Sequence, residues 1–216
     1  MQTRNAFQQE DHAMSAPLHA PAPVRGDARR QQVLDAASGC FREHGFHGAS
    51  IQRISQAAGM SAGHIYHYFA NKEAIVIGIV EQALHEALEL MHRIGEASKS
   101  IGVVEAVVAA AAEAINAPAP ELRNGLDLEI LAEASRNPVI AIAIQQGSKI
   151  WHSKMRDLLL QSPALKRLPE SELDSRITVL RSIFEGLGIR ALCDPSTSKA
   201  STTAVVQRVL RMLMDG

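Results

Sequence analysis

The stretch SIQRISQAAGMSAGHIYHYFANK, residues 50–72, decides the fold. In its first half Ile54 and Ala58 recur at the spacing of one helix face. Ser50 stands where a helix N-cap belongs, and Gly59 can adopt the left-handed conformation that ends a helix. We therefore predict a short helix between Ser50 and Gly59.

A second short helix follows after the turn at residues 58–61. Ser61 can cap this helix, and its spacing points Ile65 and Phe69 toward the core. Two short helices with such a connection form a helix-turn-helix, whose second helix enters the major groove of DNA.

The outward face of the second helix carries hydrogen-bonding groups. His64, Tyr66 and His67 point away from the core, and three of the eight Phe, Tyr and Trp residues of the chain gather at positions 66–69. We assign Phe69 and partly Tyr68 to anchoring the helix, and Tyr66 to contacting DNA.

Phosphate contacts are expected around the same two helices. Gly63 permits close backbone approach, Ser61 lies at a positive helix end, and Lys72 can neutralise a phosphate. Residues 25–72 carry six Lys or Arg against three acids, a local charge of +3, so the rest of the chain carries about −4. The basic surface is therefore local.

The composition is that of an ordinary globular protein. The chain has 216 residues, of which 46% are hydrophobic and 21% charged, and its net charge is −1. No apolar run approaches the roughly 18 residues of a membrane span, and no apolar signal core opens the chain. Two cysteines form no disulfide framework. We expect a cytoplasmic location with reduced thiols.

The chain divides into three expected parts. Residues 1–27 are rich in Pro and Ala and are interpreted as a disordered arm, with Met1 or Met14 as the true start. Residues 28–72 form the helix-turn-helix domain, and residues 73–216 form an effector-binding and dimerisation domain. The fold is predicted to be all-α, because no segment alternates like a strand. About nine helices are expected: one from residue 28 to Gly45, the two short ones, and 72–95, 102–116, 120–136, 138–161, 170–193 and 199–214.

The segments VLDAA and CFREHGFHGASIQRISQAAGMSAGHIYHYFANKEAI resemble the TetR/AcrR family of bacterial transcriptional regulators, from about residue 33 to 75. The matching positions run from the first helix to the start of the fourth. Two positions depart from the family pattern: Arg53 replaces the usual acid and Ser55 the usual Ala. Neither breaks the motif, and Arg53 offers a further phosphate contact. The matches are Ala37, Phe41, Gly45, Phe46, Ile54, residues 58–61, residues 63–66, Tyr68, Phe69 and Lys72.

The resemblance implies a homodimer that reads palindromic DNA with two recognition helices about 34–36 Å apart. The alternative for any single position is mere exposure to solvent. Gln52 and the two histidines are the expected base readers. The expected DNA contacts, from the resemblance and the residues together, are Ser50, Gln52, Arg53, Ser61, Ala62, Gly63, His64, Tyr66, His67, Tyr68 and Lys72.

The C-terminal part resembles the family more loosely. FEGLGIRAL, residues 184–192, precedes a proline-containing loop and a last helix, and resembles the final helix pair that forms a four-helix bundle with its symmetry mate. Gly186 and Gly188 allow close approach of helices there, although they can also pack within one subunit.

The resemblance also implies a ligand cavity. Its walls would come from apolar stripes that could equally be ordinary core. Glu129, Glu133 and Arg181 are either polar anchors of this cavity or surface charges. The candidate effector residues are Leu84, Leu88, Met91, Leu131, Ile144, Ser148, Trp151, Met155, Arg181 and Phe184.

No catalytic residue, cofactor or metal site is predicted. His85, Glu89 and His92 share one helix face, but a solvated helix explains them as well as a metal does. Phosphate-binding loops, nucleophile elbows and dinucleotide fingerprints are all missing from the sequence.

The combined prediction is a non-enzymatic, dimeric transcriptional repressor that a small apolar effector releases from its operator. One alternative is an architectural or constitutive DNA-binding regulator without an effector. A helical interaction protein that binds no DNA is a third hypothesis, which the outer face of residues 62–67 disfavours.

Overall fold

The computed structural model describes residues 25–117 and 120–215. Within these ranges every regular element is helical, so the all-α prediction is confirmed. The first 24 residues of the expected arm lie outside the described part of the chain. Residues 25–27 already belong to the first helix. The elements are α1 (Arg25–Gly48), α2 (Ile51–Ala57), α3 (Ala62–Tyr68), α4 (Lys72–Ile101), α5 (Val103–Asn116), α6 (Pro120–Ala134), α7 (Pro138–Leu159), the short 3-10 helix η1 (Leu165–Arg167), α8 (Glu170–Cys193) and α9 (Lys199–Met214).

Three glycines with positive φ interrupt or end helices. Gly45 has φ of +68° and kinks α1, where the sequence predicted a stop, and Gly59 has φ of +62° in the turn between α2 and α3. The predicted end of α4 near residue 95 is wrong, because Gly95 stays helical and α4 continues to Ile101. Gly102, with φ of +81°, ends it instead. Without a Cβ these residues adopt left-handed backbone at little cost.

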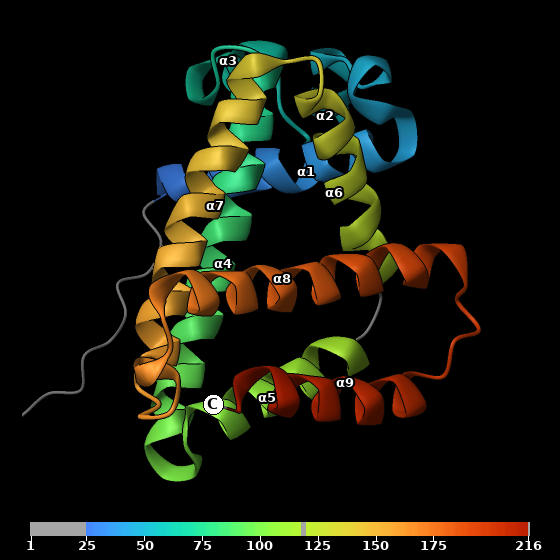
Figure 1. Ribbon diagram of the computed structural model, residues 1–216. Helices are drawn as coiled ribbons and strands as arrows, with labels where there is room; N and C mark the ends of the chain where they lie inside the picture. The colour runs from blue at the N-terminus through green and yellow to red at the C-terminus, as the bar shows by residue number, and fades with distance from the viewer. Residues whose placement is uncertain (1–24, 118–119, 216) are drawn as a thin grey trace, which may run out of the picture.

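Two apolar clusters fill the molecule, and α4 and α7 pass through both (Figure 1). The N-terminal core joins the first three helices to the start of α4 and to parts of α6 and α7. The C-terminal core joins the far ends of α4 and α7 to α5, α8 and α9. The buried members of the N-terminal core are Val33, Leu34, Ala37, Cys40, Phe41, Phe46, Ala49, Ile54, Ile65, Phe69, Ile75, Val76, Ile79, Leu126, Ile130 and Ile140.

The helices stack around α4 and α7. These two run side by side, α5 packs on both α4 and α9, and α8 lies above α9 on the same side of the molecule (Figure 1). Helix α6 packs on α1, α7 and α8 and so stands between the first helices and the C-terminal ones. No helix in the described ranges is both long and apolar enough to traverse a bilayer.

Close contact between α1 and α4 depends on Gly78. A Cβ at this position would lie 3.0 Å from Leu34 Cδ2 and 3.1 Å from Phe69 Cε1 and Arg30 Nη2. Leu34 and Phe69 are both buried, so neither side chain has room to retreat. The absent methyl group therefore allows α4 to approach the base of the helix-turn-helix.

We expect Gly78→Ala to lower the free energy of unfolding by about 1 kcal/mol. Overpacking costs about 1–3 kcal/mol, which outweighs a helix-propensity gain of about 1 kcal/mol. Gly125→Ala in α6 is the control, because no heavy atom lies within 4 Å of its added Cβ, and it should stabilise by about 0.5–1 kcal/mol. Urea denaturation measures both, and a more stable Gly78→Ala protein would contradict the close contact.

Candidate nucleic-acid interface

Helix α3 is anchored on one side and open on the other. Ile65 is fully buried and Phe69, at the C-cap of α3, is buried in the N-terminal core. On the opposite face His64 and His67 are exposed, and Tyr66 has 54% of its surface accessible. The helix therefore presents hydrogen-bonding side chains on a support that cannot rotate without exposing its apolar face.

Two histidine rings contact Tyr68 at the edge of this face. The His64 ring stacks on Tyr68 at 5.5 Å between centroids and 20° between planes. The His67 ring meets Tyr68 edge-on at 5.1 Å and 83°. Tyr68 is half-buried and packs against the N-terminal core. It lies at the boundary of the two faces and contacts both imidazoles.

Serine caps hold the starts of both short helices. Ser50 Oγ accepts a hydrogen bond from the Arg53 amide at 3.2 Å, and Ser61 Oγ accepts one from the His64 amide at 3.2 Å. Both caps agree with the sequence prediction. A side-chain cap satisfies an amide that the first turn of a helix leaves unpaired. The exposed side chains of α2 and α3 thus project from helices with fixed starting points.

Arg53 and Lys72 are engaged within the protein. Arg53 Nη1 lies 2.8 Å from His44 Nε2, so its guanidinium is turned toward the end of α1. Lys72 Nζ donates to the Phe46 carbonyl at 2.5 Å and lies 4.2 Å from the centre of the Phe46 ring. Burial lowers the pKa of the Lys72 ammonium below its usual range. Because an ammonium has three donors, this contact leaves capacity for a phosphate.

Polar contacts that the sequence did not reveal fix α1 to the helix-turn-helix. Gln32 Nε2 donates to the Ala58 carbonyl at 2.7 Å, which ties α1 to the turn before α3. Arg30 lies 5.1 Å from the centre of the Phe69 ring and 3.3 Å from Glu81. Helical spacing places these side chains on a face of α1 but does not identify their partners.

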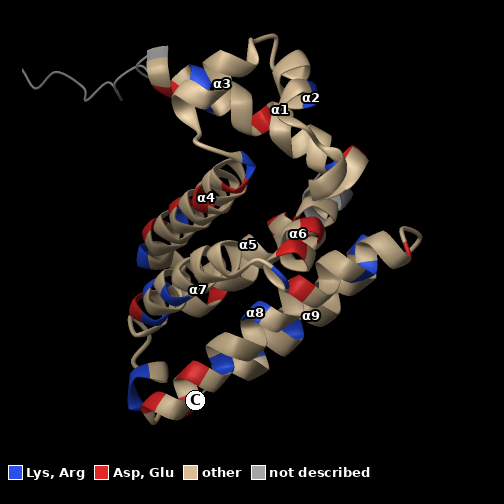
Figure 2. Cartoon of the chain, turned by 90° about the horizontal axis from the view of Figure 1, so that it is seen from above, with Lys and Arg blue, Asp and Glu red and all other residues tan. Residues whose placement is uncertain are grey.

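Charge is sparse on the two short helices. In Figure 2 α2 and α3 are almost wholly tan, because Arg53 is their one Lys, Arg, Asp or Glu side chain. Base contacts from this surface would therefore come from neutral amide and phenol groups and from histidine.

The comparisons with known proteins point to one family. The family described as "Bacterial regulatory proteins, tetR family" matches residues 33–79, which hold α2, α3 and part of the core that supports them. The helix-turn-helix region of the chain is therefore similar to that of tetR-family regulators. The relatives that it matches are named as transcriptional regulators and repressors, not as enzymes.

One relative that the chain matches is the HTH-type transcriptional regulator UidR of Escherichia coli (strain K12). The two are 34% identical over 117 residues, which is 54% of this chain and 57% of UidR. The chain thus spans little more than half the length of that relative. Other relatives are named HTH-type transcriptional repressors.

Solved structures share the fold over nearly the whole chain. Salmonella enterica GusR matches with a TM-score of 0.72 at 22% identity, over 88% of this chain and 97% of that one. The multidrug binding protein EbrR, complexed with malachite green, matches with a TM-score of 0.63 at 17% identity, over 86% and 97%. At sequence identities of 22% and 17%, the similarity to these two structures shows a shared fold and nothing more.

The expected effector residues fall into different surroundings. Met91 and Met155 are buried in the C-terminal core, and Leu88, Trp151 and Phe184 pack against it. Arg181 Nη1 donates to Ser148 Oγ at 3.1 Å, and its guanidinium lies 5.0 Å from the centre of the Trp151 ring. The side chain of Leu84 faces Gly147 across α4 and α7.

Two of the ten residues lie apart from the others. Ile144 packs against the N-terminal core, and Leu131 is on the outer face of α6 with 54% of its surface exposed. Glu129 and Glu133, expected as cavity anchors or surface charges, instead meet the end of α1. The sequence alone did not show which neighbour each of these four residues meets.

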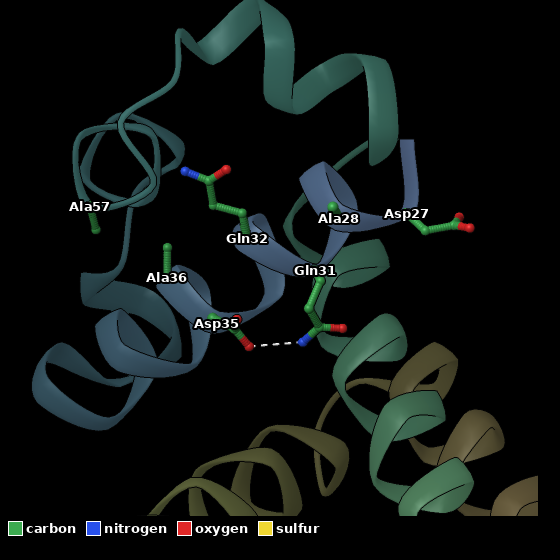
Figure 3. Close-up of a pocket in the computed structure, with 7 residues that line it drawn as sticks. All are labelled: Asp27, Ala28, Gln31, Gln32, Asp35, Ala36 and Ala57. Carbon is green, nitrogen blue, oxygen red and sulfur yellow. Dashed lines mark hydrogen bonds between the residues drawn. The ribbon is translucent and has the colours of Figure 1, made fainter. Parts of the chain in front are cut away.

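Two open hollows lie along α1, away from these residues. They have volumes of about 650 and 490 Å³ and share Asp35, Ala36 and Ala57. In Figure 3 the Gln31 amide donates to Asp35 at 2.8 Å beside the first hollow. None of the ten expected effector residues lines either one.

His85, Glu89 and His92, which the sequence places on one face of α4, are all exposed to solvent. His85 Nε2 lies 3.5 Å from Glu89 Oε1, and both side chains are exposed. Across the described ranges no three His, Cys, Asp or Glu side chains are arranged to hold a metal ion.

The cap of α3 gives a direct test of how this helix is held. Ser61→Ala should lower the free energy of unfolding by about 1 kcal/mol, because the His64 amide loses its acceptor. Ser61→Gly should lower it by a few tenths of a kcal/mol, about as observed for such caps generally. Urea denaturation of the two variants measures the difference, and equal losses would mean that the cap does not stabilise α3.

Proposed function

We propose that this protein is a dimeric transcriptional repressor that binds a palindromic DNA operator through α3. The observation that supports this best is the division of α3 into a buried face and an exposed face of histidine and tyrosine. Such a helix suits the major groove, where side chains read base edges by hydrogen bonds. A repressor that binds chromosomal DNA acts in the bacterial cytoplasm.

The proposed readers and the proposed phosphate contacts come from different positions. Tyr66, His64, His67 and Gln52 are exposed and have donors or acceptors for bases or phosphates. Lys72 and Arg53 carry charge beside these side chains and would contact the DNA backbone, which fixes register without reading sequence. Ser50, Ser61, Ala62, Gly63 and Tyr68 complete the proposed surface.

The proposed dimer forms through α8 and α9. On α8 the exposed positions Val179, Ser182, Gly186, Ile189 and Cys193 follow one another at intervals of three and four, which makes a narrow stripe of small and apolar side chains.

On α9 Val205, Val209 and Met212 form a second exposed stripe, and Met212 has 77% of its surface accessible. Two helices that each bear such a stripe can form a four-helix bundle with a second copy across a two-fold axis. Gly186, with no heavy atom within 4 Å of a built Cβ, leaves room for a close helix crossing.

The proposed effector is a small, largely apolar molecule that binds between α4, α7 and α8. Trp151, Phe184 and Leu88 would supply the apolar contacts, and Arg181 with Ser148 would supply a polar anchor. The fold neighbour EbrR, which was determined with malachite green, supports such a use of this fold. Binding would shift α4, which runs from the C-terminal core to Lys72, and would change the spacing of the two α3 helices.

One observation favours the alternative of a regulator without an effector: Met91 and Met155, both expected in the pocket, are buried in the C-terminal core. Titrating the operator complex with small apolar molecules that are uncharged or anionic separates the two proposals, because release of DNA by such a molecule is not expected of a constitutive regulator.

Operator binding is tested by footprinting the protein on DNA upstream of its own gene, then on genomic fragments. Tyr66→Ala should weaken the protected site at least tenfold through lost base or phosphate contacts. Lys72→Ala should weaken it and reduce the slope of log affinity against log salt by about 1.

Lys99→Ala is the matched control for the charge change, because Lys99 is exposed at the far end of α4 and pairs with Glu96. It should leave the footprint and the salt slope unchanged. A salt-independent affinity, or protection that tolerates both Tyr66→Ala and Lys72→Ala, would refute the proposed DNA surface.

The dimer is tested by sedimentation velocity at micromolar concentration. Met212→Glu should convert the dimer to a monomer, because a carboxylate would be buried unpaired in the bundle. Val139→Glu on α7 is the control: Val139 has 57% of its surface exposed but lies outside both stripes. Equal sedimentation of wild type and Met212→Glu, or dissociation by Val139→Glu alone, would place the interface elsewhere.

A further inference from the structure

The carboxylate of Glu133 is buried, which is unusual for a charged side chain. Only 4% of this residue is exposed, and no other Asp, Glu, Lys or Arg is buried among the residues whose side-chain burial the structure describes. Its Oε2 lies 2.9 Å from Arg136 Nε and 3.2 Å from His47 Nε2. Because an unpaired buried carboxylate is strongly unfavourable, the position of α6 is tied to these partners.

The partner on the other side is the kinked end of α1. His47 follows Gly45, whose positive φ breaks the helix, and a Cβ on Gly45 would lie 3.3 Å from Glu129 Oε2. Between them the Phe46 carbonyl accepts from Lys72, and the Phe46 ring meets the His47 ring edge-on at 5.2 Å. Residues 45–47 are thus held by α6 on one side and by the first residue of α4 on the other.

This segment leads directly into the helix-turn-helix. Ser50, which caps α2, follows His47 by three positions, and Ala49 between them is fully buried. Helix α6 packs on α1 and also on α7 and α8, which places it between the proposed dimer helices and the proposed DNA surface (Figure 1). A displacement of α6 would therefore act on α1 through residues 45–47.

We propose that Glu133 is a positioning residue for operator binding, which fixes the end of α1 to α6 and thereby sets the orientation of the helix-turn-helix. The inference rests on the proposed function. It adds a second mechanical connection to the helix-turn-helix, from α6 to α1, beside the proposed shift of α4. Four charged or titratable groups lie near Glu133. His47 belongs to α1 and Lys72 to α4, whereas Glu129 belongs to α6 and Arg136 to the loop after it.

The test uses the full chain with Glu133→Gln, His47→Gln and the double variant. Gln keeps the size of Glu and some hydrogen bonds but removes the charge, and His47 is mostly exposed, so its replacement leaves the fold intact. Glu105→Gln is the matched control: Glu105 is held by Arg211 through bonds of 2.7 and 2.8 Å between α5 and α9. Operator affinity, the urea midpoint and amide hydrogen exchange of residues 46–57 are measured for each.

We expect Glu133→Gln to weaken operator affinity about tenfold, within the range of typical coupling between sites. Exchange of residues 46–57 should quicken in Glu133→Gln and His47→Gln and stay unchanged in Glu105→Gln. The double variant should lose no more affinity than Glu133→Gln alone, because both changes remove one interaction. Partial recovery in Glu133→Asp, which restores the charge, would separate positioning from general stability.

Unchanged affinity and exchange in Glu133→Gln would overturn the proposal, as would fully additive losses in the double variant. If Glu133→Gln fails to fold, His47→Gln alone decides, and wild-type behaviour of that variant overturns the proposal. If the wild type binds no DNA, the proposed function fails by itself. Exchange of residues 46–57 then still shows whether α6 holds the end of α1.

Discussion

The structure depends on one shared apolar core beneath the helix-turn-helix. Helices α2 and α3, of seven residues each, are too short to bury their own apolar faces, and Ile54, Ile65 and Phe69 share one buried cluster with side chains from α4, α6 and α7. Isolated short helices are marginal in water, so tertiary packing stabilises α2 and α3. The same packing exposes the outer face of α3, because anchoring one side of a helix fixes what the other side presents.

Much of this arrangement could be predicted because its signals are local. Ser50, Ser61 and Asn71 precede helices and cap them, and Gly59 has the left-handed backbone that its position required. The family resemblance also depends on local signals, because it rests on residues at fixed spacing within one continuous stretch of the sequence. Local rules worked less well at the end of α4, where Gly95 and Gly102 look alike in sequence but only Gly102 departs from the helix.

The contacts between distant helices could not be predicted in this way. Glu133 and His47 are 86 positions apart in sequence and meet at 3.2 Å, and Gln32 reaches the Ala58 carbonyl across α1 and the turn. A periodic pattern shows which face of a helix is apolar, but not which neighbour it meets. For this reason the expected effector residues include Leu131, which faces outward, whereas Glu129 and Glu133 belong to the contact between α6 and α1.

The composition of the N-terminal core has a consequence for protein engineering. Leu126, Ile130 and Ile140 come from α6 and α7, yet they complete the core under α1 and α3. Each buried aliphatic side chain contributes about 1.5–3 kcal/mol. A chimaera that joined residues 25–72 to the C-terminal helices of another protein would lose these three side chains as well as Ile75, Val76 and Ile79 of α4, and would leave apolar surface uncovered. The segment that folds with the helix-turn-helix is therefore discontinuous in sequence. A stable hybrid must also carry α6 and the start of α7, or side chains from its new partner that fill the same places in the core.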